Sequence, residues 1–272
     1  MGNFFNYNGQ VMPAGQEVQD RASRSCRAGD GLFETMRFHH DRIVLEDYHF
    51  DRLSGGMQAL KLEMPAVENA RLKDLVRELC FVNGHHPAAR VRLTIFRGEQ
   101  NNQSDFIIES LQLDPIYSYV DGLIIGVYPD AYKIPNTSSP FKTNYQLYSS
   151  AALYAQERSW DDCLVLNQAG NICDASIANV FWAKDGEIAT PPLAEGCIAG
   201  VMRRYLLNVM QVKRFPIIEK ELTIETLLNA DEAFLTNMIR GIRPVASFQG
   251  RTYGNILTKR IFTELVAPLV YS

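Results

Sequence analysis

The sequence has few cysteines, and none of them is spaced as a metal-binding or disulfide pair. Its five cysteines are scattered over 272 residues and never form a CxxC pair. This argues against a zinc ribbon and against a small domain held together by disulfides. The neighbouring histidines His85 and His86 lie in a polar stretch with no visible partner ligand, so no metal site is expected there.

Long apolar runs and a strong basic charge are also missing. No segment approaches the apolar length that a membrane span needs, and the N-terminus lacks the basic region and apolar core of a signal peptide. The net charge of −4 gives no general attraction for nucleic acid or for anionic membranes. We therefore expect a cytoplasmic protein that binds neither of them, in which an anionic ligand is held by a local site.

The common nucleotide-binding and hydrolase motifs are absent. There is no GxxxxGK[ST], no GxGxxG after a strand, and no GxSxG elbow. The triplet Gly29-Asp30-Gly31 is too short to be a phosphate loop on its own. Function must therefore be sought in other residues.

What the sequence does have is the composition of a globular protein, with 46% hydrophobic and 21% charged residues. Its length allows two ordinary domains. Hairpin patterns alternate with amphipathic helices, which favours an α+β arrangement in two parts. The stretch 115–121 has no strong helix or strand pattern, so we expect a small N-terminal domain over 1–114, a linker over 115–121 and a larger domain over 122–272.

Local patterns predict most of the elements. Residues 16–30 are expected to form a loop or short helix. Predicted strands cover 4–7, 10–12, 32–38, 42–45, 90–96, 106–113, 123–128, 163–167, 171–175, 179–184, 187–189, 217–222, 232–236, 245–248 and 251–253. Predicted helices cover 46–62, 72–82, 145–158, 202–211, 224–228 and 256–266.

The stretch 141–181 holds two residues with both an ordinary and a chemical interpretation. Lys142 could be a solvated surface lysine, but it precedes an aromatic-rich helix, and a lysine that forms an imine must be desolvated or lie near other cations. Asp174 could be an edge charge on an apolar strand. It could equally pair with a cationic ring nitrogen, as a pyridoxal cofactor requires. Arg52 is either a helix-surface residue or a clamp for a phosphate.

Together these residues resemble the class IV aminotransferase family, the fold-type IV pyridoxal phosphate enzymes, over nearly the whole chain. The motifs that carry the resemblance are GDGLFETMR at 29–37, HFDRL at 49–53, RLTIFRG at 92–98, Lys142, DASIANVF at 174–181, GCIAGVMR at 196–203, and FLTN at 234–237 continuing to GIRPV at 241–245.

The resemblance implies a fold, a cofactor and an assembly. It implies two α/β domains, pyridoxal 5'-phosphate in the cleft between them, and a homodimer. The implied catalytic residue is Lys142, which attaches the cofactor as a Schiff base. The implied cofactor-binding residues are Arg52, Lys142, Tyr145, Asp174, Gly200, Val201, Met202, Asn237 and Met238. The implied substrate-binding residues are Phe33, Arg37, Arg92, Arg97, Met238 and Ile239.

Four positions depart from the family pattern. Asp174 replaces the usual glutamate and is one methylene shorter. The spacing from Lys142 to Asn144 is one residue tighter than usual. Met202 and Met238 stand where many members place a hydroxyl on the phosphate, and Ala28 stands where an aromatic residue often precedes the Gly-Asp-Gly triplet.

The resemblance leaves the reaction open. The first expectation is an aminotransferase acting on a small, branched-chain-type amino acid and a 2-oxo acid. The alternative is a 4-amino-4-deoxychorismate lyase that produces 4-aminobenzoate and pyruvate. A non-catalytic binding protein that retains the fold is a third possibility, motivated by Asp174, Met202 and Met238. The loop Glu99 to Asp105 has no Arg or His, unlike the loop that binds the carboxylate in D-amino-acid transaminases.

Overall fold

The computed structural model describes residues 2–16, 29, 31–63, 65, 67–98, 103–120 and 122–270. Most of the predicted loop 16–30, with Ala28 and Asp30, lies outside these residues, as do positions 99–102 and 121. The chain divides into two compact units. Unit 1 comprises 1–116 and 141–144, and unit 2 comprises 117–140 and 145–272. The short excursion Phe141–Asn144 is a feature that the predicted domain ranges do not contain.

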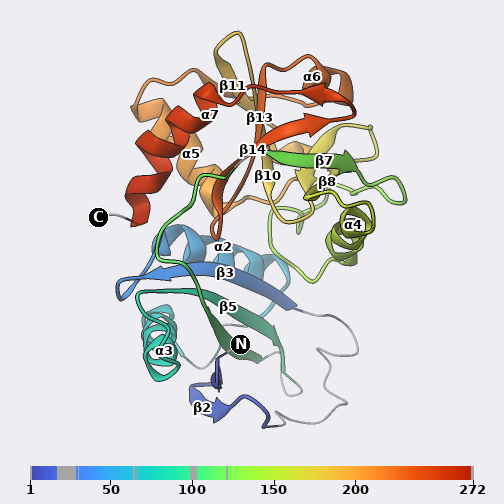
Figure 1. The fold of residues 1–272 in the computed structure, drawn as a ribbon. Coiled ribbons are helices and arrows are strands. Elements are labelled where there is room, and N and C mark those ends of the chain that lie inside the picture. Colours follow the sequence, from blue (N-terminus) through green and yellow to red (C-terminus); the bar gives the residue numbers. More distant parts are fainter. Residues whose placement is uncertain are drawn as a thin grey trace. The chain divides into compact units, whose positions relative to one another are not determined.

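In the part of unit 1 that the structure describes, a six-stranded antiparallel sheet is accompanied by two helices. Its elements are β1 (Phe4–Tyr7), β2 (Gln10–Pro13), β3 (Gly31–His39), β4 (Arg42–Ile43), α2 (Glu46–Ala59), α3 (Asn69–Val82), β5 (Ala88–Arg97) and β6 (Ser104–Gln112). The strand order is β2-β1-β6-β5-β3-β4. The neighbouring strands β3 and β5 are labelled in Figure 1.

The two faces of this sheet differ because side chains alternate along each strand. On one face Leu32, Met36 and Phe38 of β3 lie opposite the apolar residues of β5, and this face carries the core. The inner residues of both helices, among them Leu53 and Leu75, belong to the same cluster. Thus α2 and α3 cover one face of the sheet, and the intervening residues of β3 point to the other.

Unit 2 is a larger mixed sheet with helices. Its elements are β7 (Leu123–Val127), α4 (Gln146–Glu157), β8 (Asp162–Leu166), β9 (Ile172–Ala175), β10 (Asn179–Lys184), β11 (Glu187–Thr190), α5 (Val201–Val212), β12 (Ile217–Glu219), α6 (Ile224–Leu228), β13 (Glu232–Asn237), β14 (Gly241–Phe248), β15 (Arg251–Thr252) and α7 (Ile256–Ile261). The strand order is β12-β11-β10-β13-β14-β7-β8-β9, and β15 pairs with β14.

The helices of unit 2 pack through apolar faces. In α5 the buried residues include Val201, Met202, Leu206 and Met210, whose spacing places them on one side of the helix. Helix α4 packs near β8 through Leu147, Ala151 and other small buried side chains. Figure 1 shows α5 and α7 beside β13, and α4 beside β8.

The predicted α+β class is confirmed, and the elements differ from the sequence patterns mainly at their ends. Strand β4 has only two residues, and β12 ends at Glu219. The closing helix is regular only to Ile261, and a wider π-type turn follows over Phe262–Val266. Strand β14 begins at Gly241, whose φ of +68° suits the turn from β13.

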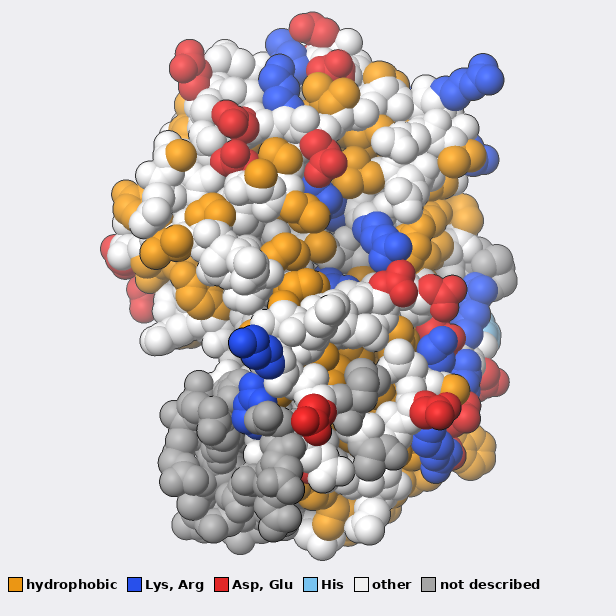
Figure 2. Space-filling model, turned by 180° about the vertical axis from the view of Figure 1, so that it is seen from behind, with side chains coloured by type: hydrophobic (Ala, Val, Ile, Leu, Met, Phe, Trp, Pro, Cys, Tyr) orange, Lys and Arg blue, Asp and Glu red, His pale blue; other side chains and the backbone are white. Residues whose placement is uncertain are grey.

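Among the described ranges, no helix combines the length and the apolar character needed to cross a membrane. On the face drawn in Figure 2, acidic and basic side chains are interspersed among hydrophobic and neutral polar ones. The net charge of −4 is therefore not gathered into one acidic region on this face.

Candidate active site

Lys142 lies at the edge of strand β3 in unit 1. The backbone N–H of Phe33 donates to the Lys142 carbonyl at 2.8 Å, and Leu32 forms an antiparallel bridge with Thr143. This register places Lys142 on the same face of the sheet as Phe33, opposite the helices. The preceding Phe141 packs against the glycine pair 55–56 of α2, where a Cβ on Gly56 would lie 3.2 Å from the Phe141 ring. Phe141 thus fixes the segment that carries the lysine.

The amine of Lys142 has aromatic, hydroxyl and cationic neighbours. Its Nζ lies 3.4 Å from Thr35 Oγ1 and 4.8 Å from the centre of the Phe33 ring. The Arg92 guanidinium lies 3.8 Å from the same ring. Burial, and then the Arg52 charge, lower the pKa of Lys142 from 10.5 to about 8, although Glu34 acts in the opposite direction. The side chain keeps some solvent exposure, and a useful fraction of its amine is neutral near pH 7.

Arg52 is held in place by a buried carboxylate. Its Nε and Nη2 each donate to one oxygen of Glu34 at 2.7 Å, a bidentate pair. His49 Nδ1 lies 2.6 Å from Glu34 Oε2. Burial alone would raise the pKa of Glu34, but the charges of Arg52 and His49 outweigh it and the pKa falls to about 2. Glu34 is therefore ionised and orients Arg52 from α2.

The three candidate substrate arginines have different surroundings. Arg37 donates to the backbone carbonyls of Asp114 and Ile116. Arg97 lies on the face covered by α2 and donates to the carbonyls at positions 60 and 61. Arg92 pairs with Thr35 across the sheet, on the face of Lys142. The structure therefore brings Arg92 and Phe33 together with Lys142, whereas Arg37 and Arg97 bind backbone carbonyls.

Asp174 is the centre of a buried network in unit 2. Its Oδ2 accepts from Tyr148 Oη at 2.6 Å and from the Ile198 N–H at 2.9 Å. Its Oδ1 accepts from Asn179 Nδ2 at 2.8 Å. The β8–β9 turn places Asp174 in this position, because Asn167 Oδ1 accepts from the N–H groups of two residues of the turn. Burial raises the pKa of Asp174, while these donors and Lys133 oppose the rise.

The same network holds the N-terminus of α5. Asn179 Nδ2 also donates to the Ile198 carbonyl at 2.8 Å, so both backbone groups of Ile198 are fixed. A Cβ on Gly200 would lie only 1.8 Å from Asn179 Oδ1, which explains the glycine. No side chain of a described residue caps α5, whose first residues are Val201 and Met202. The N–H groups at this helix start point outward from the first turn, as anion-binding helix termini do.

Tyr145 stands at the residue before α4 and is 42% exposed. Its ring lies 6.0 Å from that of Tyr148, centre to centre, in an edge-on arrangement. Tyr148, one turn further, is the tyrosine that reaches Asp174. Tyr145 is thus more exposed to solvent than Tyr148.

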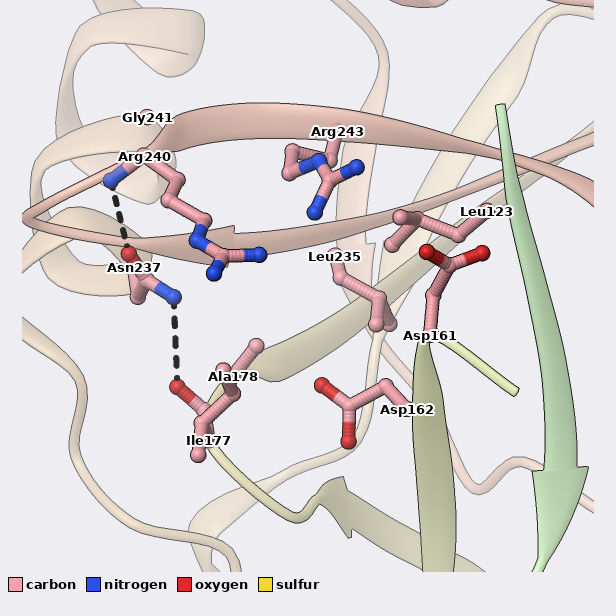
Figure 3. Close-up of a pocket in the computed structure, with 10 residues that line it drawn as sticks. All are labelled: Leu123, Asp161, Asp162, Ile177, Ala178, Leu235, Asn237, Arg240, Gly241 and Arg243. Atoms are coloured by element: carbon pink, nitrogen blue, oxygen red, sulfur yellow. Dashed lines mark hydrogen bonds between the residues drawn. The ribbon is translucent and has the colours of Figure 1, made fainter. Parts of the chain in front are cut away.

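A tight turn between β13 and β14 carries the remaining candidates. Asn237 Oδ1 accepts from the N–H groups of Ile239 and Arg240, and its Nδ2 donates to the Ile177 carbonyl at 3.3 Å. The carbonyl of Met238 accepts from the Tyr117 hydroxyl. Figure 3 shows Asn237 bridging to Ile177 beside a hollow. The hollow is lined by Leu123, Asp161, Asp162, Ile177, Ala178, Leu235, Asn237, Arg240, Gly241 and Arg243.

Several residues of these networks are not among the site residues predicted from the sequence. Thr35 could have been predicted, because it lies two residues after Phe33 on a predicted strand and therefore on the same face of the sheet. Glu34 has a weaker signal, as a charged residue among the core positions of that strand. Lys133 has none, because it is an isolated lysine in a proline-containing loop. Among the described residues no cluster of His, Cys, Asp or Glu could hold a metal ion.

The donors present fit pyridoxal phosphate, within each unit by itself. Unit 1 offers a lysine with a pKa of about 8 and an arginine oriented by Glu34. Unit 2 offers the open start of α5 and a carboxylate whose Oδ1 accepts a single hydrogen bond among the described residues. A carboxylate oxygen has two lone pairs, so Asp174 Oδ1 retains one for a ring N–H.

A sheet-edge lysine with a lowered pKa in unit 1, and a buried acid linked to a helix start in unit 2, are donors of the kind that a pyridoxal phosphate enzyme needs. The sequence model "Amino-transferase class IV" matches residues 31–248, and the chain belongs to this family, whose cofactor is pyridoxal phosphate.

Relatives within the family include both expected activities. The chain is 26% identical to aminodeoxychorismate lyase of Bacillus subtilis, with 91% of this chain and 87% of that protein covered. It is 25% identical to a putative branched-chain-amino-acid aminotransferase of Methanocaldococcus jannaschii, with 84% and 81% covered. The solved branched-chain aminotransferase of Thermoproteus uzoniensis with norvaline has the same fold, with a TM-score of 0.89, 23% identity, and 99% and 95% covered. The predicted fold-type IV architecture and the predicted cofactor are therefore confirmed.

Proposed function

We propose that the protein is an aminotransferase that moves the amino group of a small, branched-chain-type amino acid to a 2-oxo acid. The observation that carries the proposal is the surroundings of Lys142. Its amine has a pKa of about 8 and shares one face of the sheet with an aromatic ring and Arg92. A partly neutral amine, an apolar wall and a cation suit an amino acid with an apolar side chain and a carboxylate.

When bound, pyridoxal phosphate supplies an electron sink for the electron pair left at the substrate Cα. The chain's own residues supply the rest. Lys142 Nζ takes the proton from the substrate Cα and returns a proton to the product. Arg92 binds the substrate carboxylate, and Phe33 contacts the side chain. Asp174 Oδ1 holds the proton of the ring N–H.

Each unit, taken by itself, offers candidate donors for the cofactor phosphate. Arg52 provides the charge, oriented by Glu34. Backbone N–H groups at Val201 and Met202 provide hydrogen bonds, which is consistent with the absence of hydroxyl side chains at this position. The Gly200 N–H instead donates to the Ile198 carbonyl at 2.8 Å, so Gly200 remains a proposed contact of the cofactor only as part of this turn. Asn237, Met238 and Ile239 remain proposed contacts through their turn, and Tyr145 remains a proposed partner of the cofactor hydroxyl. Arg37 and Arg97 are proposed only as supports, because they bind backbone carbonyls.

Single-turnover spectroscopy with a panel of amino donors tests the proposal. The cofactor-loaded protein is mixed with one amino acid at a time, and loss of the visible cofactor band is followed. Valine, leucine or isoleucine should discharge the band fastest, and adding a 2-oxo acid should restore it. Lys142→Ala should abolish the reaction, whereas Lys184→Ala, on the exposed surface, should leave it unchanged. A donor panel with no response from any branched-chain amino acid would refute this substrate class.

A lyase reaction is the second candidate. The similarity to the Bacillus subtilis lyase favours it, and so does the Thr35 hydroxyl 3.4 Å from Lys142 Nζ. An elimination needs a proton delivered to the leaving fragment as well as a base at Cα, and a hydroxyl beside the amine could carry it. Supplying aminodeoxychorismate without any 2-oxo acid separates the two reactions. Rapid release of 4-aminobenzoate would replace the aminotransferase proposal with this one.

A non-catalytic protein with the same fold makes a different prediction. It would show no visible cofactor band after incubation with pyridoxal phosphate, and borohydride would not fix a pyridoxyl group on Lys142. We further propose a cytoplasmic homodimer, as the family resemblance implies. Light scattering coupled to size-exclusion chromatography measures the molar mass, and a monomer mass at micromolar concentration would contradict the dimer.

A further inference from the structure

Unit 2 contains a buried lysine that the proposed chemistry does not use. Lys133 is 3% exposed, although lysines are almost never buried without a partner. Its N–H donates to the Leu166 carbonyl at 2.8 Å, and it forms a parallel bridge with Asn167. The backbone of Lys133 is therefore fixed beside the end of β8, next to the strand pair that carries Asp174.

The side chain of Lys133 ends at the same carboxylate oxygen as Tyr148. Lys133 Nζ lies 3.5 Å from Asp174 Oδ2 and donates to Tyr148 Oη. Tyr148 Oη in turn donates to Asp174 Oδ2 at 2.6 Å. The hydrogen bonds from Lys133 to Tyr148 and from Tyr148 to Asp174 are consistent in direction, because the ammonium donates to the hydroxyl and the hydroxyl donates to the carboxylate. The carbonyl of Ser139, 3.4 Å from Nζ, accepts a further bond.

The two carboxylate oxygens of Asp174 have different surroundings. The lysine, the tyrosine and the Ile198 N–H all approach Oδ2, whereas Oδ1 accepts only from Asn179 among the described residues. The positive charge thus lies at one oxygen, and the other oxygen is left for a ligand.

Charge balance explains why a cation is needed at this position. A carboxylate buried among neutral groups favours its protonated form. The other titratable groups that face Asp174 are Tyr148 and the thiols of Cys173 and Cys197, and burial raises the pKa of all three, so they are neutral. Among the described residues, Lys133 is the cation that pairs with Asp174.

We propose that Lys133 is a positioning residue whose ammonium, together with the Tyr148 hydroxyl, keeps Asp174 ionised and turns its Oδ1 toward the cofactor ring. The part that concerns the ring rests on the proposed function, and the pairing itself does not. A second lysine thus governs the protonation of the acid that holds the ring N–H. Without it, Asp174 takes up a proton at a higher pH and can no longer accept from the ring.

The pairing is tested in the protein without cofactor. Thermal unfolding midpoints are measured for Lys133→Met, for Asp174→Asn and for the double variant. Each single change leaves an unpaired buried group and should lower the midpoint, whereas the double variant should recover a large part of the loss. The control is Lys184→Met, which removes a lysine from an exposed pair with Asp231 and should shift the midpoint little. Additive single effects in the double variant would overturn the pairing.

The role toward the cofactor is tested by affinity at two pH values. The ratio of the variant's Kd to that of the wild type should exceed tenfold for Lys133→Met at pH 6 and be clearly smaller at pH 8. Lys133→Arg, which keeps the charge, should show a smaller ratio at pH 6. A merely structural role would give the same ratio at both pH values, and that result would overturn the proposal.

Two further outcomes are distinguishable. If Lys133→Met does not fold, Tyr148→Phe takes its place in the comparison with Lys133→Arg, and Tyr148→Phe should lose more affinity at pH 6 than at pH 8. If the wild type itself does not bind pyridoxal phosphate, the proposed function fails. The unfolding measurements without cofactor then still decide whether Lys133 and Asp174 act as a pair.

Discussion

The ion pair between Glu34 and Arg52 makes a quantitative prediction about acid stability. Both side chains are buried, with 2% and 8% exposure, so solvent screens the pair little. The pKa of Glu34 falls from 4.5 to about 2, and this difference corresponds to about 3 kcal/mol, because one pKa unit is worth about 1.4 kcal/mol. A carboxylate with a lowered pKa stabilises the fold above its unfolded-state pKa. The contribution is therefore present above about pH 5 and lost as the pH falls toward 2.

The substitution Glu34→Gln should remove this contribution. At pH 7 the variant should be less stable than the wild type by about 3 kcal/mol, because Arg52 loses its buried partner. The difference should shrink as the pH falls toward 3, because the unfolded wild type takes up a proton on Glu34 below about pH 4.5 while the folded protein keeps it ionised. Urea denaturation followed by circular dichroism, at several pH values between 3 and 7, measures both curves.

The matched control for this experiment is Glu78→Gln on α3. Glu78 pairs with Arg71 on the surface, where both side chains are 48% exposed. Exposed pairs contribute roughly 0–1 kcal/mol, so this variant should remain close to the wild type at every pH. If Glu34→Gln differs from the wild type by the same free energy at pH 3 and pH 7, then Glu34 is not the ionised partner described here.

Three further predictions concern the cofactor site. The pKa of Lys142 is about 8, so the fraction of neutral amine rises with pH. The rate of pyridoxal phosphate attachment to the apoprotein should therefore rise about a hundredfold from pH 6 to pH 9 and then level off. A rate, measured by stopped flow, that still rises tenfold per pH unit above pH 9 would contradict this. Gly200→Ala should weaken cofactor binding more than tenfold and lower stability by about 3 kcal/mol, since its Cβ would meet Asn179 at 1.8 Å. Gly15→Ala, where a Cβ meets no atom of a described residue within 4 Å, is its control. Phe141→Ala should destabilise the fold by about 2 kcal/mol in urea denaturation and slow cofactor attachment; unchanged attachment would show that Phe141 does not position the lysine.

The sequence predicts the local parts of the fold well because they depend on local patterns. The Asn8-Gly9 turn fixes the first hairpin, and the alternation along β3 and β5 fixes which residues face the core. The order and spacing of short motifs identify the family, although Lys142 and Asp174 have ordinary interpretations when taken singly. These features need only neighbouring residues or a fixed order along the chain.

Long-range partners are the part that could not be predicted. Nothing near Lys142 in the sequence indicates pairing with β3, more than a hundred residues earlier. In the sequence Arg37 and Arg97 look available for a ligand. In the structure, backbone carbonyls distant in sequence accept hydrogen bonds from them. Lys133 reaches Asp174 only because its backbone lies beside β8. In each case a non-local backbone position, which no local pattern encodes, decides the role of the side chain.

The four-residue excursion Phe141–Asn144 has a consequence beyond holding a lysine. Strand β3 pairs with β4 only near its C-terminal end, at Phe38 and His39, and Lys142 and Thr143 cover the same edge further back. An uncovered edge of an apolar strand can pair with another molecule. The segment that carries the proposed catalytic amine is therefore also expected to protect unit 1 from intermolecular strand pairing. Substitutions at these four positions should therefore affect solubility as well as catalysis. When the Phe141→Ala variant is heated, it should aggregate through the uncovered edge and scatter more light than the wild type.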